Sequence, residues 1–168
     1  MFDLSLEDIF TAGAFECALK RLKRTALGLD GLSVEDICSG EFYAELKSEI
    51  FSLSYSPQPL KRAFIPKEAK DELRKLAVPS LKDKFAQNIL TRELSGYFDK
   101  SFSNRSYAYR NGKSYANAIF RARDFFKIFS FAVKTDIKDF FENIDHEKLL
   151  EILRANIRDA RIIRLIEL

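Results

Sequence analysis

Apolar residues recur at intervals of three and four through most of this chain, and this helical spacing limits its fold more than any other feature. Residues 5–23 predict one amphipathic helix and residues 42–52 predict another. Ser33 and Asp36 have the spacing of a capping box, which predicts a short helical turn between the two helices. The N-terminal third of the chain is therefore predicted to be helical.

A Pro-Gln-Pro sequence at 57–59 interrupts this spacing, because proline cannot continue a helix. Residues 60–67 and 73–79 then predict the two strands of an antiparallel hairpin. Residues 131–137 alternate apolar and polar side chains and predict one more strand, with Asp136 at its C-terminal end. Helices combined with these strands predict the α+β fold class.

Three residues after the predicted hairpin have the character of helix N-caps: Ser80, Ser114 and Asp145. The helix after Ser114 has apolar residues at helical spacing, which are expected to face inward. They are Tyr115, Ala118, Ile119, Ala122, Phe125, Phe126 and Phe129. The last residues, 162–168, are apolar and helical in spacing.

Composition excludes several classes of protein. The chain has 168 residues, 46% of them hydrophobic, which suits one globular domain or one large domain plus a fragment. No apolar run approaches the ~20 residues of a membrane span, and the acidic, amphipathic start is not a signal peptide. Cys17 and Cys38 are expected to be reduced thiols in a cytoplasmic protein. A single histidine, His146, argues against a His-based metal site and a Ser-His-Asp hydrolase.

Charge is distributed unevenly along the chain. Residues 1–59 contain 5 basic and 10 acidic side chains. Residues 60–92 contain 9 basic and 4 acidic ones, and residues 98–127 contain 7 basic and 2 acidic ones. This basic middle predicts a surface for a polyanion, and an ordinary solvated face is the alternative.

Residues 131–150, which begin Phe-Ala-Val-Lys-Thr-Asp-Ile-Lys-Asp-Phe-Phe, closely resemble the first palm motif of prokaryotic reverse transcriptases. The group II intron, retron and CRISPR-associated members are the most similar in character. Further blocks resemble that family in the expected order: 28–31, 55–67, 74–87 and 98–114. Ala108 and Tyr109 stand where the family usually has Gly and often has Phe.

The resemblance implies an incomplete right-hand polymerase. Residues 1–54 would be a helical extension of the fingers, 55–130 the fingers, and 131–168 the beginning of the palm. The sequence contains no Tyr-x-Asp-Asp, so the second palm motif of the family is missing. Two-metal phosphoryl transfer needs carboxylates from both motifs, and the chain alone is therefore expected to be an inactive fragment of a longer enzyme.

The resemblance also implies site residues. Asp136 would be the catalytic residue and a ligand of Mg²⁺, with the carbonyl of Ile137 as a second ligand. Phe141 would exclude the 2′-hydroxyl of a ribonucleotide, and the backbone amides of Asp139 and Phe140 would face the triphosphate. Taken alone, Asp136 would more simply end a strand in a turn, and the alternative for Phe141 is a place in the core.

Lys67 and Arg74 would grip the incoming dNTP, or else form a solvated hairpin tip. Other cations would contact the nucleic-acid backbone, and these are Lys61, Arg62, Arg105, Arg110 and Lys113. Tyr107 and Tyr109 would stack on bases or, as we expect, pack beneath the fingers.

The resemblance thus implies an RNA-directed DNA polymerase that adds dNTPs to a primer 3′ end. The alternative is a non-catalytic RNA-binding or oligomerisation module derived from such an enzyme. The implied partners are an RNA template and a DNA or RNA primer, with no membrane. An unpaired strand edge recruits other chains, so homodimerisation is expected through 131–137 or the apolar C-terminal helix.

Overall fold

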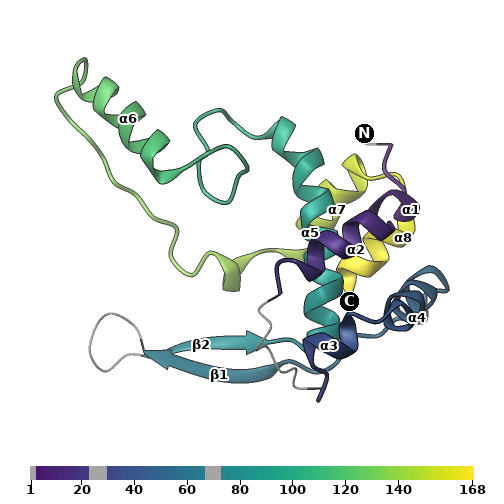
Figure 1. The fold of residues 1–168 in the computed structure, drawn as a ribbon. Helices are drawn as coiled ribbons and strands as arrows, with labels where there is room; N and C mark the ends of the chain where they lie inside the picture. The colour runs from purple at the N-terminus through teal and green to yellow at the C-terminus, as the bar shows by residue number, and fades with distance from the viewer. Residues whose placement is uncertain (1–2, 23–29, 67–72) are drawn as a thin grey trace.

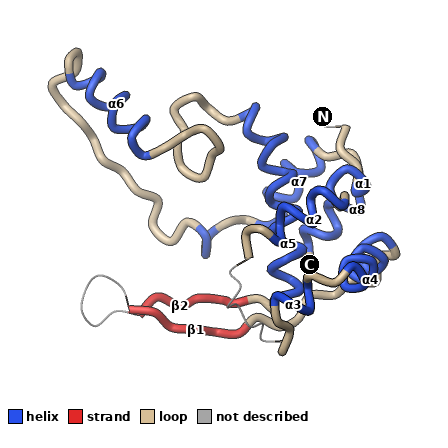
Figure 2. Tube along the Cα trace, viewed as in Figure 1, coloured by secondary structure: helices blue, strands red, loops and turns tan. Residues whose placement is uncertain are grey.

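The computed structural model describes residues 3–22, 30–66 and 73–168, and it shows a helix-rich chain with one antiparallel hairpin (Figures 1 and 2). The predicted α+β class is confirmed at this level. The helices are α1 (Leu6–Ile9), α2 (Ala12–Leu19), α3 (Val34–Ile37), α4 (Gly40–Phe51), α5 (Leu81–Phe98), α6 (Tyr115–Phe126), α7 (His146–Asn156) and α8 (Ala160–Glu167). The 3₁₀ turns are η1 (Asp99–Ser101) and η2 (Phe141–Asn143), and the strands are β1 (Lys61–Pro66) and β2 (Leu73–Val78).

The predicted N-caps are confirmed. The side chains of Ser33, Ser80, Ser114 and Asp145 each accept a hydrogen bond from the backbone N–H three residues on. A short polar side chain at this position satisfies an N–H that has no partner inside the helix. These helix starts are therefore decided by local sequence.

The single helix predicted over 5–23 is wrong, because the chain breaks between α1 and α2 at Phe10 and Thr11. The Thr11 hydroxyl accepts a hydrogen bond from the backbone N–H of Ala14 at 3.1 Å and so begins a new helix. The break lets both Phe10 and Phe15 enter the core.

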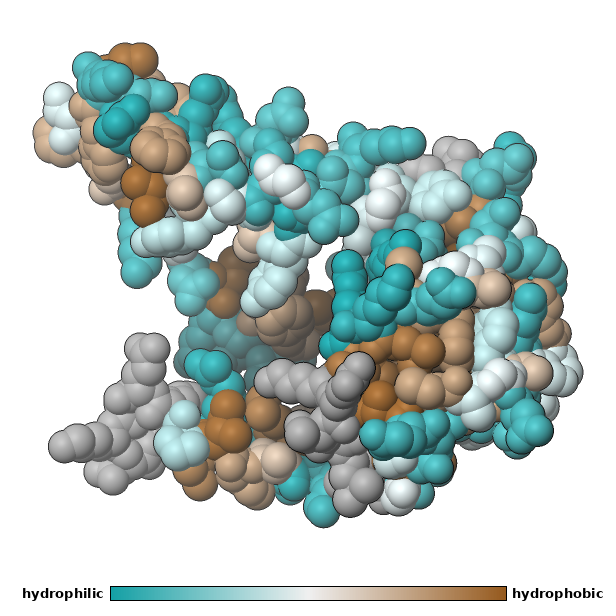
Figure 3. Space-filling model, viewed as in Figure 1, coloured by the Kyte–Doolittle hydropathy of each residue, from teal (hydrophilic) through white to brown (hydrophobic). Residues whose placement is uncertain are grey.

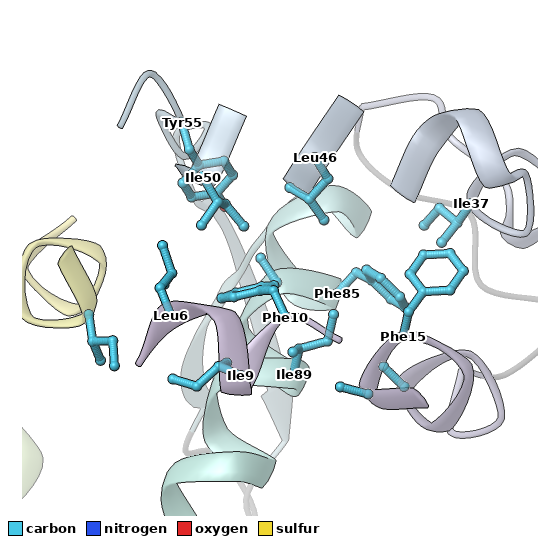
Figure 4. Packing of buried hydrophobic residues seen from close by; sticks show 14 of the residues in the cluster. Leu6, Ile9, Phe10, Phe15, Ile37, Leu46, Ile50, Tyr55, Phe85 and Ile89 are labelled. Carbon is cyan, nitrogen blue, oxygen red and sulfur yellow. The ribbon is translucent and has the colours of Figure 1, made fainter. Parts of the chain in front are cut away.

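The core forms around the N-terminal half of α5. Phe85 and Ile89 are completely buried between α1 and α2 on one side and α4 on the other (Figure 4). The rings of Phe85 and Phe15 meet edge to face with centroids 5.0 Å apart. Leu46 from α4 closes the same cluster. Each of these apolar side chains stabilises the fold by roughly 1.5–3 kcal/mol when it leaves water.

The two ends of the chain lie side by side. The backbone N–H of Leu6 donates to the Asp159 carboxylate at 2.9 Å, and Arg161 forms two hydrogen bonds with Glu7. Ile162 of α8 is completely buried against this region. The core of the chain itself therefore covers part of the apolar face of α8, and dimerisation through this helix stays a prediction.

The lowered pKa of Asp159 is expected to make the stability of the chain sensitive to acid. Hydrogen bonds from Arg161 lower the pKa of Asp159 from 3.8 to about 2. A lowered pKa means that this contribution to stability is complete above about pH 4 and is lost as the pH falls toward 2. Asp159→Asn is expected to lower the free energy of unfolding by about 2 kcal/mol near neutral pH, because charge-assisted hydrogen bonds are removed.

Urea unfolding followed by circular dichroism at several pH values measures this effect. The Asp159→Asn chain should lose less stability than the wild type between pH 4 and pH 2. Glu142→Gln, at an exposed position in η2, serves as the control. Equal acid dependence in wild type and Asp159→Asn would contradict the assignment.

Helix α6 stands away from the other helices, at the end of an arm formed by residues 99–145 (Figure 1). The prediction that its apolar residues face inward is wrong, since none of its residues is buried. Tyr115, Ile119, Phe120 and Phe126 are exposed, and apolar side chains gather on this arm in Figure 3. Amphipathic spacing produces the helix, but burial needs an opposing surface, and the described residues place none there.

The strand predicted over 131–137 is also wrong. These residues are extended, but they pair with no strand among the residues that the structure describes. A strand is completed by hydrogen bonds to a neighbour, and alternation of side chains cannot supply that neighbour. Phe131 and Val133 remain exposed. Pairing of this segment with a second chain stays a prediction.

Candidate nucleic-acid interface

The hairpin is a basic element that extends away from the helical core (Figure 1), and its predicted position is confirmed. Its register pairs Lys61 with Val78, Arg62 with Ala77, Phe64 with Lys75 and Ile65 with Arg74. Residues opposite one another in an antiparallel pair share a face, and successive residues alternate between faces. The cations of the hairpin are therefore divided between its two faces.

One face carries Arg62, Phe64 and Lys75, which we call the Phe64 face. The other carries Lys61 and Arg74. The side chains of all five are exposed, and about half of the Phe64 surface lies open to water. The resemblance groups Lys61 with Arg62 as nucleic-acid contacts, whereas the pleat of the strands places Lys61 on the same face as Arg74. Lys67, predicted to pair with Arg74 in binding a nucleotide, lies outside the described residues.

Asp83 joins the base of the hairpin to α5. Its carboxylate accepts hydrogen bonds from the Tyr55 hydroxyl at 2.6 Å, the Ser80 hydroxyl at 2.7 Å and the Gln58 backbone N–H at 2.9 Å. Only 2% of Asp83 is exposed. Burial, helped by the Asp83 hydrogen bond, raises the pKa of Tyr55, so its hydroxyl stays protonated and donates.

A second contact ties residues before the hairpin to the same helix end. The Asp30 carboxylate accepts from the backbone N–H of Lys82 at 3.1 Å, and the Lys82 ammonium pairs with Glu49 at 2.7 Å. The family motifs include Asp30 and Asp83, but they do not show that both carboxylates accept hydrogen bonds at the start of α5. The Ser-x-x-Asp spacing at the start of α5 was the available signal for Asp83.

The stretch 98–114 wraps around Arg110. Its guanidinium donates to the Asp99 side chain at 2.6 Å and to the backbone carbonyls of Asp99, Ser103 and Ser106. Only 6% of its side chain is exposed, and its hydrogen bond lowers the pKa of Asp99. Arg110 thus cross-links this stretch and has little surface for the nucleic-acid contact predicted for it.

The neighbouring cations predicted to contact nucleic acid, Arg105 and Lys113, are less enclosed than Arg110. Arg105 is exposed and lies over the Phe125 ring at 5.9 Å, and Lys113 lies over the Tyr107 ring at 5.5 Å. Tyr109 is fully exposed, so the expectation that it packs inside is wrong. Tyr107 is half-buried, as expected.

The predicted palm residues lie together in the segment that leads to α7. Asp136 and Ile137 are exposed in the extended stretch, and Asp139 follows with a positive φ of 50°. The Asp139 carbonyl accepts a hydrogen bond from the Asn143 side chain at 2.8 Å, which holds the turn before η2. The rings of Phe140 and Phe141 meet edge to face.

Phe141 is 81% exposed, so the alternative that it is a core residue is wrong. Its ring lies five residues after Asp136 on an accessible surface, which leaves both free to contact a ligand.

Comparison with known proteins identifies the relatives of this chain. It is 34% identical over 138 residues to an intron-encoded 91 kDa protein of Schizosaccharomyces pombe, a match that covers 82% of this chain and 16% of that protein. It is 29% identical over 136 residues to the group II intron-encoded protein LtrA of Lactococcus lactis, covering 79% of this chain and 23% of LtrA. The chain is a relative of group II intron-encoded proteins.

These relatives confirm the resemblance to group II intron reverse transcriptases that the motifs predict. Protein YkfC of Escherichia coli is 28% identical over 133 residues, which cover 72% of this chain and 33% of YkfC. The chain therefore spans a third or less of the length of these curated relatives. No known family model matches it.

The acidic side chains that the structure describes in this chain do not by themselves form a Mg²⁺ site. Across the described ranges, no three acidic, histidine or cysteine side chains gather where a metal ion could be held. Asp136 supplies one carboxylate, and Mg²⁺ prefers several oxygen ligands at octahedral geometry. A complete site would need carboxylates from outside the described residues.

Cys17 and Cys38 carry free thiols, as predicted. None of the helices in the described part of the chain is long and apolar enough to span a membrane.

Proposed function

We propose that this chain forms the fingers and the beginning of the palm of a reverse transcriptase, and that its hairpin binds RNA. Its relation to group II intron-encoded proteins supports the family, and the exposed hairpin supports the RNA contact. The observation that carries the proposal is the Phe64 face, where an aromatic ring lies opposite Lys75 and next to Arg62 on the same strand. Cations attract phosphates and exposed rings stack on unpaired bases.

The proposal assigns different ligands to the two faces of the hairpin. The Phe64 face would hold the RNA strand, whereas Arg74 on the opposite face, together with Lys67, would grip the incoming dNTP. An arginine fork suits a triphosphate or the edge of a base, and lysine suits a terminal phosphate.

The palm part of the proposal concerns Asp136. Asp136 and the Ile137 carbonyl would contribute to holding Mg²⁺, which supplies charge neutralisation in phosphoryl transfer. The backbone amides of Asp139 and Phe140 would face the triphosphate, and the exposed Phe141 ring would exclude a 2′-hydroxyl. The 168 residues alone would not catalyse primer extension, because they include no Tyr-x-Asp-Asp.

Titration of a fluorescent single-stranded RNA at several KCl concentrations tests the RNA contact. Arg62→Gln with Lys75→Gln is expected to weaken binding and to reduce the slope of log K against log salt by about 0.7 for each phosphate that the protein no longer neutralises. Lys61→Gln with Arg74→Gln removes the same charge from the opposite face and is the matched control, with a smaller expected effect.

Equal affinities and slopes in wild type and both double variants would contradict RNA binding by the hairpin. Equally weakened binding in the two double variants would contradict the assignment to the Phe64 face.

A second candidate function is a non-catalytic RNA-binding module. The observation that favours it is the lack of a metal-binding cluster around Asp136 within the described ranges. Both candidate functions include RNA binding by the hairpin. They differ in whether a longer polypeptide containing these residues catalyses DNA synthesis.

A further inference from the structure

A cavity of about 490 Å³ lies beside the second half of α5, away from the hairpin. Arg21 follows α2 and lines it on one side, while Asn88 and Arg92 line it from α5. Tyr109 and Asn111, from the stretch held by Arg110, line it as well. Its volume lies within the range of sites that bind small ligands.

Arg92 leaves a donor without a partner in this wall. Its Nη1 atom is buried and makes no hydrogen bond to any group that the structure describes, while its Nε lies 3.5 Å from Glu93. Buried polar groups in native proteins almost always have a partner, and an orphan donor commonly marks an unseen water or ion. A guanidinium pairs best with a planar or phosphate oxyanion.

The charges of the lining favour an anion. Arg21, Arg92 and Arg110 face a single lining carboxylate, Asp99. Arg110 and Asp99 already form an ion pair at 2.6 Å, and Arg92 Nε lies 3.5 Å from Glu93, so Arg21 and the Nη1 atom of Arg92 are the guanidinium donors left for an anion. The ion pair between Arg110 and Asp99 holds this side of the cavity in place before any ligand arrives, which reduces the entropic cost of binding.

Tyr109 adds an aromatic surface to the cavity. Its side chain is fully exposed, and its backbone has a φ of 57°, a region that large side chains seldom occupy. A ring wholly in water contributes no burial to its own fold, so it is free for a ligand. Unpaired RNA bases stack on such rings, and amide side chains such as Asn88 can hydrogen-bond to base edges.

We propose that this cavity binds one unpaired nucleotide of a single-stranded RNA. Arg92 and Arg21 hold its phosphate and Tyr109 stacks on its base. The inference rests on the proposed RNA-binding function and adds a second contact region to that of the hairpin. Of these residues, only Tyr109 was considered from sequence as an RNA contact.

Binding of a fluorescent single-stranded oligouridine over a KCl series tests the cavity. Arg92→Gln is expected to weaken binding and to lower the salt slope by about 0.7, as for one phosphate contact. Tyr109→Asn keeps a residue that tolerates positive φ but removes the ring, and is expected to weaken binding roughly five-fold or more with the slope unchanged. Lys84→Gln removes one charge from an exposed position of α5 outside the cavity and is the control.

Affinities of Arg92→Gln and Tyr109→Asn that match that of Lys84→Gln would overturn the cavity proposal. If the Arg62→Gln/Lys75→Gln double variant weakened RNA binding in the same titration, the proposed RNA-binding function would stand even though the cavity proposal had failed. A wild-type chain that bound no RNA would instead overturn the proposed function. Because the Tyr109 side chain is exposed, its variant reports on binding even if Arg92→Gln proves unstable.

Discussion

Replacing Asp136 with asparagine is expected to lower primer extension by at least about 10²–10³-fold. The measurement needs a polypeptide that joins these residues to a Tyr-x-Asp-Asp motif, because the chain itself includes none. Asparagine keeps the shape of the side chain and removes its negative charge. Asp136 is exposed, so we expect its replacement to leave the fold intact.

Extension of a labelled DNA primer on an RNA template, with dNTPs and Mg²⁺, measures the effect. Glu142→Gln is the matched control, since it removes one exposed carboxylate from the same segment. Phe141→Ala should instead leave dNTP addition largely intact and admit ribonucleotides. Robust synthesis by the 168-residue chain alone that survives Asp136→Asn would overturn the site and the expected inactivity together.

Asp83→Ala is expected to lower the free energy of unfolding by about 4 kcal/mol, since each buried donor left unsatisfied costs about 1–3 kcal/mol. The Tyr55 hydroxyl, the Ser80 hydroxyl and the Gln58 N–H would all be deprived of their shared acceptor. A decrease of this size is a large fraction of the stability of a small domain. The junction of hairpin and α5 should open first, because all three donors lie there.

Urea unfolding followed by circular dichroism measures this decrease, with Lys84→Ala as the control one residue along α5. Lys84 is exposed, so its replacement should change the stability by less than about 0.5 kcal/mol. Similar stability of the Asp83→Ala and Lys84→Ala chains would contradict the role of Asp83.

Local patterns predicted the elements whose causes are local. Ser33, Ser80, Ser114 and Asp145 cap their helices because the capping bonds span only three residues. The hairpin followed from two short apolar and basic stretches placed close together in the chain. The family resemblance followed from ordered motifs, and the relatives confirm it.

The candidate site was predictable only in part. Arg62, Arg74 and Asp136 could be named from motifs, but the division of cations between two hairpin faces depends on strand register. The internal role of Arg110 depends on a stretch that folds around it. The cavity needs Arg21 and Arg92, which lie far apart in the sequence and in no common motif.

The sequence by itself determined where helices begin, where the hairpin lies and which family the chain is related to, because these depend on neighbouring residues or on motif order. The tertiary structure alone decided which apolar surfaces are covered. Ile162 is buried because the two ends of the chain meet through Leu6 and Asp159. Phe120 and Phe131 have equally apolar surroundings in sequence but remain exposed, because burial requires an opposing surface and the described residues provide none.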